Sequence, residues 1–89
     1  MAERQVKVTT DVGLHARPAA VFVQSAAQSS EDVTLAKFDP AAESQNRVNA
    51  KSILAVLGLD VRNGDEVIIA SEDAEAVDRL AALVTEETS

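Results

Sequence analysis

The only histidine of the chain, His15, lies two residues before a guanidinium group, that of Arg17. A neutral imidazole has a free nitrogen lone pair near neutral pH, so it can act as a nucleophile. Pro18 fits a helix only in the first turn, where its missing N–H would have had no partner. We therefore expect a helix to start beside His15, with Ala16 and Arg17 in its first turn. The free N–H groups of such a turn and the helix dipole favour a bound anion.

This pattern suits the transfer of a phosphoryl group, which needs an in-line nucleophile and positive charge around three oxygens. The positive end of the helix dipole disfavours protonation of the His15 ring, which keeps the ring ready to attack. Arg17 can donate a fork of N–H groups to the same oxygens. By itself the pattern is weak, because a lone histidine near a helix start is more often a surface residue and a lone arginine a solvated charge.

The composition and charge of the chain argue against several other kinds of site and partner. The chain has 89 residues, which we interpret as one domain spanning residues 1–89, and a formal net charge of −7, which argues against nucleic acid as a partner. There is no cysteine, so disulfides and thiolate metal sites are excluded. No acidic residue follows His15 at the three-, four- or seven-residue spacing of a helix to complete a metal site. We expect no metal, no cofactor and no membrane insertion. Small secreted domains often carry disulfides, so their absence favours a cytoplasmic location.

Hydrophobic periodicity predicts seven elements that would position this chemistry. Strands are expected at residues 5–9, 32–38, 47–50 and 66–71, and helices at 16–28, 52–58 and from 72 to 84. Ser52 is the expected N-cap of the short helix, and Gly58 its expected C′ residue. The strand at 66–71 is apolar on both faces, which is typical of a central strand. The order β-α-β-β-α-β-α favours one sheet with helices on one face.

The run Gly-Leu-His-Ala-Arg-Pro-Ala at residues 13–19 resembles the active-site signature of HPr, the histidine phosphocarrier family of the bacterial sugar phosphotransferase system. Val-Asn-Ala-Lys-Ser-Ile-Leu at 48–54 and Val-Leu-Gly-Leu at 56–59 extend the resemblance. It implies an α+β open-faced β-sandwich: a four-stranded antiparallel sheet, order 1-4-2-3, with three helices on one face. It also implies a carrier, not an enzyme. His15, through Nδ1, would accept a phosphoryl group from phosphorylated Enzyme I and pass it to IIA domains of sugar permeases, with Arg17 stabilising the phosphate.

The resemblance assigns two further roles. Ser52 matches a regulatory serine that an HPr kinase/phosphorylase modifies in some bacterial lineages, although a plain N-cap explains a serine there equally well. The implied partner interface consists of apolar residues and a lysine: Leu14, Lys51, Ile53, Leu54 and Leu57. A small apolar patch rimmed by Arg17 and Lys51 would suit a weak, transient contact. We expect the carrier to be a monomer.

Two departures from the family pattern stand out. Val12 occupies a position where many members carry a small polar residue, and the segment 38–47 is several residues longer, which predicts a looped-out excursion. Three alternatives stay open: a regulatory binding module of the same fold, a carrier in a nitrogen-linked phosphotransfer chain, and a hydrolase with His15 as general base. The last lacks a partner acid or nucleophile.

Overall fold

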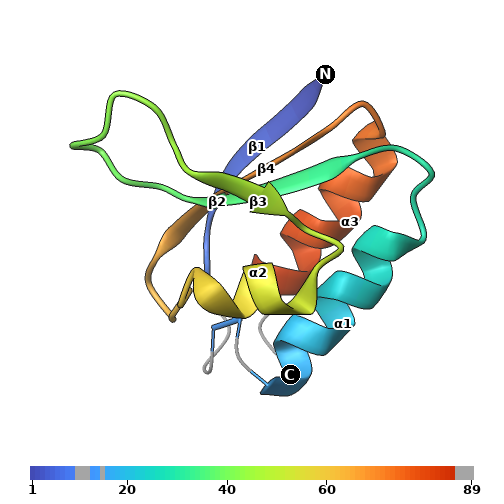
Figure 1. Cartoon of the computed structure of the whole chain (residues 1–89), viewed down its shortest axis with the longest axis horizontal. Helices are drawn as coiled ribbons and strands as arrows, with labels where there is room; N and C mark the ends of the chain where they lie inside the picture. The colour runs from blue at the N-terminus through green and yellow to red at the C-terminus, as the bar shows by residue number, and fades with distance from the viewer. Residues whose placement is uncertain (10–12, 15, 86–89) are drawn as a thin grey trace.

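The computed structural model describes residues 1–9, 13–14 and 16–85, without the side chain of Ala16. In chain order its elements are β1 (Ala2–Lys7), α1 (Ala16–Ala27), β2 (Val33–Lys37), β3 (Arg47–Asn49), α2 (Ile53–Gly58), β4 (Glu66–Ser71) and α3 (Ala74–Thr85). The four strands form one antiparallel sheet in the order β1-β4-β2-β3. Figure 1 shows the three helices together on one side of this sheet. The predicted fold class and element order are confirmed.

The hydrophobic core lies between the sheet and the helices. Its largest fully buried side chains come from both layers, for example Phe22 of α1, Leu35 of β2, Ile69 of β4 and Leu80 of α3. Each such burial stabilises the fold by about 1.5–3 kcal/mol. Because successive strand residues face opposite sides, one face of each strand supplies this core. The core therefore fixes α1 and α3 against the sheet.

The sheet face away from the helices is also partly covered. Ala36, Ile68 and Ala70 are buried there, which explains why β4 is apolar on both faces. Glu3 lies opposite Ala70 in the pairing of β1 with β4, and Arg47 lies opposite Ala36 in that of β3 with β2. An ion pair of 2.5 Å joins these two side chains, from one edge strand to the other. The prediction that 66–71 is a central strand is confirmed.

The predicted first strand and the predicted role of Gly58 are wrong, whereas the other predicted elements begin and end within two residues of the observed bounds. The first strand runs over Ala2–Lys7 because its length is set by pairing with β4, from Ala2 opposite Ser71 to Lys7 opposite Glu66. Gly58 is the last residue of α2 and not its C′ residue: Leu59 is the C-cap, and Asp60 takes the left-handed conformation with φ 52°. Aspartate tolerates this conformation better than most residues.

Within the described ranges no helix combines the length and hydropathy needed to cross a membrane, and the longest helices, α1 and α3, have 12 residues each.

Candidate functional site

The predicted nucleophile lies at the start of α1. His15 and Val12 are outside the described residues, so their predicted roles remain predictions. The described residues on either side of it, Leu14 and Ala16, are placed in the fold. α1 begins at Ala16, which confirms that a helix starts directly after His15. Position 15 in the sequence therefore directly precedes the first turn of a helix of 12 residues.

The two residues before His15 are tightly fixed. The Leu14 N–H donates to the Val61 carbonyl at 2.9 Å. Gly13 has φ +62°, and a Cβ built there would lie 2.6 Å from the Arg62 Cα atom and closer still to the Val61 oxygen. Only glycine combines this backbone conformation with so close an approach. Gly13 and Leu14 are thus packed closely against the loop at residues 61–62.

That loop is itself held by Asp65. The Asp65 carboxylate accepts the Arg62 backbone N–H at 2.9 Å and pairs with the Lys37 ammonium at 3.3 Å. The hydrogen bond from the Arg62 backbone, followed by the contact with Lys37, holds the pKa of Asp65 below its usual range. The charged carboxylate therefore stabilises the loop against which Gly13 and Leu14 pack.

The first turn of α1 is suited to an anion. It contains no acidic residue, so the positive end of the helix dipole is not offset by a side chain of that turn. Arg17 is exposed, and it forms no hydrogen bond or ion pair with any other residue that the structure describes. Among the described residues, nothing competes with a bound anion for this guanidinium. The N–H groups of this turn and Arg17 could together hold a phosphate.

Leu14 corrects one sequence-based prediction. It was expected on an exposed partner surface, but its side chain is 2% exposed and belongs to the hydrophobic core. The left-handed turn at Gly13 and the Leu14–Val61 hydrogen bond are the local features that fix this segment against the core. The prediction that Leu14 supplies partner contacts is therefore wrong for its side chain.

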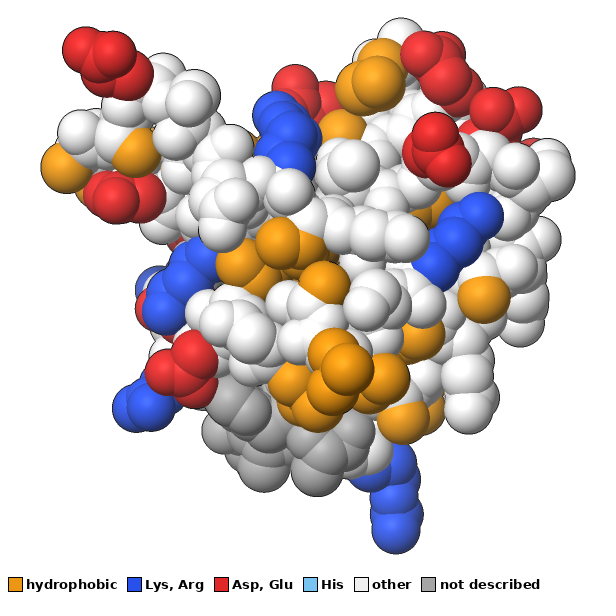
Figure 2. Space-filling model, in the orientation of Figure 1, with side chains coloured by type: hydrophobic (Ala, Val, Ile, Leu, Met, Phe, Trp, Pro, Cys, Tyr) orange, Lys and Arg blue, Asp and Glu red, His pale blue; other side chains and the backbone are white. Residues whose placement is uncertain are grey.

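The other predicted apolar residues do lie at the surface. Leu54 is 80% exposed, and Ile53 and Leu57 are each 37% exposed. α1 adds Val21, which is 44% exposed, and α1 and α2 pack against each other. Figure 2 shows apolar side chains gathered over α2 on this face. We call Val21, Ile53, Leu54 and Leu57 the α1–α2 patch.

Ser52 is the N-cap of α2, as predicted. Its backbone is extended, its hydroxyl oxygen accepts the Ala55 N–H at 3.3 Å, and its carbonyl accepts the Val56 N–H at 3.0 Å. These bonds account for a serine at this position. Its modification by a kinase remains a prediction.

Lys51 departs from the expected picture of a free cation at the rim of a patch. Its ammonium donates to the backbone carbonyl of Ser29 at 2.8 Å. Ser29 is 6% exposed, and its hydroxyl donates to the Asp73 carboxylate at 2.7 Å. That hydrogen bond, together with one from the Ala76 N–H, holds the pKa of Asp73 below its usual range.

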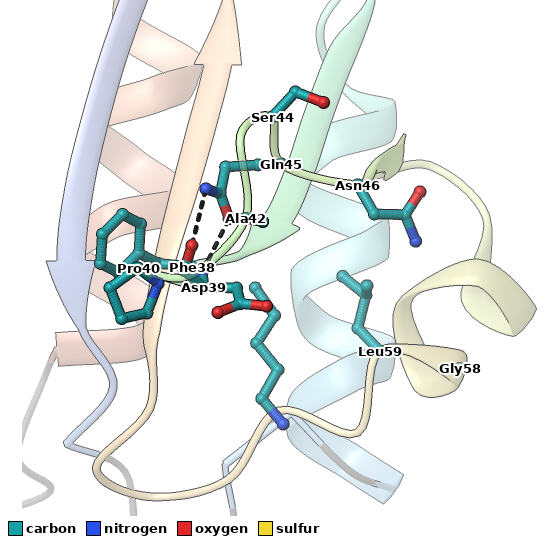
Figure 3. A pocket seen from close by; sticks show the side chains of 10 residues that line it. Phe38, Asp39, Pro40, Ala42, Ser44, Gln45, Asn46, Gly58 and Leu59 are labelled. Atoms are coloured by element: carbon teal, nitrogen blue, oxygen red, sulfur yellow. Dashed lines mark hydrogen bonds between the residues drawn. The ribbon is translucent and has the colours of Figure 1, made fainter.

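The segment between β2 and β3 is a loop with hydrogen bonds of its own. The Gln45 side chain bridges the backbone of Asp39, accepting its N–H at 2.7 Å and donating to its carbonyl at 3.0 Å. A cavity of about 440 Å³ lies between this loop and the C-terminal end of α2 (Figure 3). Phe38 and Pro40 line one side, and Leu59 lines the other. None of the predicted site residues whose side chains the structure describes lines this cavity.

Comparison with known proteins supports one family. The family model described as "PTS HPr component phosphorylation site" matches residues 2–86. The phosphocarrier protein HPr of Streptomyces coelicolor is 51% identical over 89 residues, which cover 97% of this chain and 90% of that protein. A crystal structure of HPr from Bacillus anthracis aligns with a TM-score of 0.83 at 38% identity, covering 94% of this chain and 96% of that one. Crh of Bacillus subtilis, described as a catabolite repression protein that forms a domain-swapped dimer, aligns with a TM-score of 0.68 at 39% identity over 100% of this chain and 99% of that one.

Proposed function

Because the chain belongs to the HPr family of the bacterial phosphotransferase system, we propose that His15 accepts a phosphoryl group from phosphorylated Enzyme I and passes it to IIA domains of sugar permeases. The observation that supports this most is the start of α1 at Ala16, directly after the only histidine. The protein then acts as a cytoplasmic carrier and is not itself an enzyme. A relative with 51% sequence identity bears the name phosphocarrier protein HPr.

The transfer requires little of the protein beyond the correct placement of the nucleophile and of the groups that stabilise charge. A bond forms between a ring nitrogen of His15 and phosphorus, while the bond between phosphorus and the donor group of Enzyme I breaks and the donor keeps the electron pair. The His15 ring retains its proton on the other nitrogen. The N–H groups of the first turn of α1 and the Arg17 guanidinium stabilise the charge on the three phosphoryl oxygens. The second transfer, to a IIA domain, reverses these steps.

The α1–α2 patch is the surface we assign to both partners. Its four side chains are apolar, and α2 carries no charged residue. A patch of only four side chains suits a weak encounter with the partner, which a carrier needs because it must leave after each transfer. The patch and Arg17 belong to two helices in contact with each other, so one partner surface can reach both.

Ser52 is a second phosphorylation site in this proposal, modified by an HPr kinase/phosphorylase where the organism has one. A phosphate adds a charge of about −1.5 to −2 next to Ile53 and Leu54, which would weaken docking of an apolar partner surface. Incubation with such a kinase and ATP should label the protein and leave Ser52→Ala unlabelled. Labelling of Ser52→Ala to the same level would reduce Ser52 to a helix cap.

The main proposal is tested by incubating the protein with Enzyme I and radiolabelled phosphoenolpyruvate. We expect one phosphate per chain, labile in acid and stable in base, that moves to a IIA domain when one is added. His15→Ala should not be labelled, while Ser52→Ala, the matched control, should be labelled like the parent. If His15→Ala accepts label as well as the parent does, the site is assigned to the wrong residue.

The likeness to Crh favours a second candidate, a regulatory module that acts by binding and not by sugar uptake. Such a protein would bind a target yet fail to pass phosphate to any IIA domain. A carrier in a nitrogen-linked chain would instead be charged fastest by the Enzyme I of that chain. We propose a monomer, and sedimentation at micromolar concentration would reveal a dimer of the kind described for Crh.

A further inference from the structure

Three segments of the fold meet at Ser29, far along the chain from His15. Ser29 follows the end of α1, and its N–H donates to the Ala26 carbonyl at 3.1 Å. Its hydroxyl donates to Asp73, the N-cap of α3, at 2.7 Å. Its carbonyl accepts the Lys51 ammonium, from the turn before α2, at 2.8 Å. The end of α1 is thus tied to the starts of both other helices.

Cationic side chains from elsewhere in the chain donate hydrogen bonds to the backbone carbonyls at the C-terminal end of α1. The last turn of α1 contains no basic residue of its own. Arg79 of α3 donates to the Ser25 carbonyl at 3.0 Å and to the Ser25 hydroxyl at 2.8 Å, and Lys51 donates to Ser29. Positive charge is stabilising at the negative end of a helix dipole. Lys51 is therefore held by its hydrogen bond and by the dipole together.

The backbone of Lys51 is fixed as firmly as its side chain. Its N–H donates to the Asn49 side chain at 2.9 Å, and the next N–H, of Ser52, donates to the Asn49 carbonyl at 3.1 Å. Ser52 in turn caps α2. A helix of six residues is unstable alone, so contacts outside α2 must fix its orientation. The Lys51–Ser29 hydrogen bond is one such contact, and it leads to α1.

We propose that Lys51 is a positioning residue: its ammonium, bonded to the Ser29 carbonyl, holds α2 at a fixed place relative to α1. This fixes Leu54 and Leu57 relative to Arg17, so that one partner surface meets the patch and the phosphoryl site together. The effect on partner binding rests on the proposed function. The Lys51–Ser29 hydrogen bond, which we call the clamp, does not depend on that function. It differs from the expected role of Lys51 as a cation that a partner contacts directly.

The Lys51–Ser29 hydrogen bond is tested first without any partner, by NMR of the lysine ammonium groups in protein labelled with ¹⁵N and ¹³C. We expect the Lys51 ammonium signal to exchange slowly with water and to show a coupling to the Ser29 carbonyl carbon. Lys7, an exposed lysine of β1, is the matched control and should exchange rapidly. A Lys51 ammonium that exchanges as fast as that of Lys7 would overturn the clamp, whatever the protein carries.

The effect of this positioning on partner binding is tested by the KM of Enzyme I for this protein. It is measured for Lys51→Met, Lys51→Arg and Lys7→Met at about 0.1 M and about 1 M salt. The Debye length falls from about 10 Å to about 3 Å over this range, so a directly contacted cation loses its effect at the higher salt. We expect Lys51→Met to raise KM by roughly threefold or more, by the same factor at both salt concentrations. Lys51→Arg, which can still donate to the carbonyl, should stay near the parent, and Lys7→Met should match it.

Two kinetic outcomes would refute the positioning role. One is an unchanged KM in Lys51→Met, and the other is an increase that disappears at about 1 M salt. Circular dichroism of each variant at the assay temperature establishes that the proteins compared are folded. If Enzyme I fails to charge even the parent, the proposed function fails, while the ammonium signals still decide the clamp.

Discussion

Gly13→Ala should be the most destabilising of the three glycine-to-alanine substitutions that this chain allows. Alanine at Gly13 must adopt φ +62°, which costs about 1–2 kcal/mol. Its Cβ also meets backbone atoms of Val61 and Arg62, which cannot rotate away, and such overpacking costs about 1–3 kcal/mol more. We expect a total loss of about 2–5 kcal/mol, a large part of the stability of about 5–10 kcal/mol that a domain of this size has.

The other two glycines separate these contributions. Gly64 also has positive φ, +94°, but a Cβ there meets nothing within 4 Å, so Gly64→Ala should lose only about 1–2 kcal/mol. Gly58 lies in α2 with nothing within 4 Å, so Gly58→Ala should gain up to about 1 kcal/mol. Urea unfolding followed by circular dichroism gives all three values. A Gly13→Ala protein no less stable than Gly64→Ala would refute the close contact that fixes the chain before His15.

Three further predictions concern the site and its support. Arg17→Ala should slow transfer to IIA domains in a phosphotransfer assay while changing the free energy of unfolding by less than about 0.5 kcal/mol, since no described residue pairs with Arg17; unaltered transfer kinetics would remove Arg17 from the mechanism. Leu54→Ser should raise the KM for Enzyme I with little effect on stability, because Leu54 is 80% exposed. Val56, in contrast, is 0% exposed, so Val56→Ala should destabilise the fold by about 1–3 kcal/mol in urea unfolding. Equal loss of stability in the two variants would contradict the placement of α2. Ser29→Ala should destabilise the protein more at pH 7 than at pH 2. The reason is that the Ser29 hydrogen bond lowers the pKa of Asp73 in the folded state. The stability that this bond contributes is therefore present above the pKa of Asp73 in the unfolded chain, about 4, and is lost as the pH falls through its pKa in the folded protein. Urea midpoints of parent and variant that stay equally far apart at both pH values would show that the charge of Asp73 is not involved.

Local sequence signals were sufficient for much of the fold. Pro18 limits where α1 can begin, and the helix does begin at Ala16. The apolar run at residues 66–71 predicts a strand covered on both faces, and β4 is the strand between β1 and β2. The strand order itself came from the family resemblance, because nothing local specifies which strands pair over long separations.

The errors share a physical cause. The burial of Leu14, the carbonyl bound by Lys51 and the extent of β1 all depend on residues far away in the chain. Periodicity assigns a face to a residue within a helix or strand, but it carries no information on a loop residue such as Leu14. The helix prediction for α1 rests on apolar residues at positions 16, 19, 20, 23, 26 and 27. Val21 is apolar but lies outside this set, and this was the sequence signal that Val21 is exposed.

The claim that His15 carries the phosphoryl group can be tested directly because the chain has one histidine. Protein labelled with ¹⁵N in its histidine ring gives signals from a single imidazole. On addition of Enzyme I and phosphoenolpyruvate, we predict that one ring nitrogen shifts and couples to phosphorus, and that both signals return when a IIA domain is added. A gain of phosphate mass with unchanged ring signals would contradict the account.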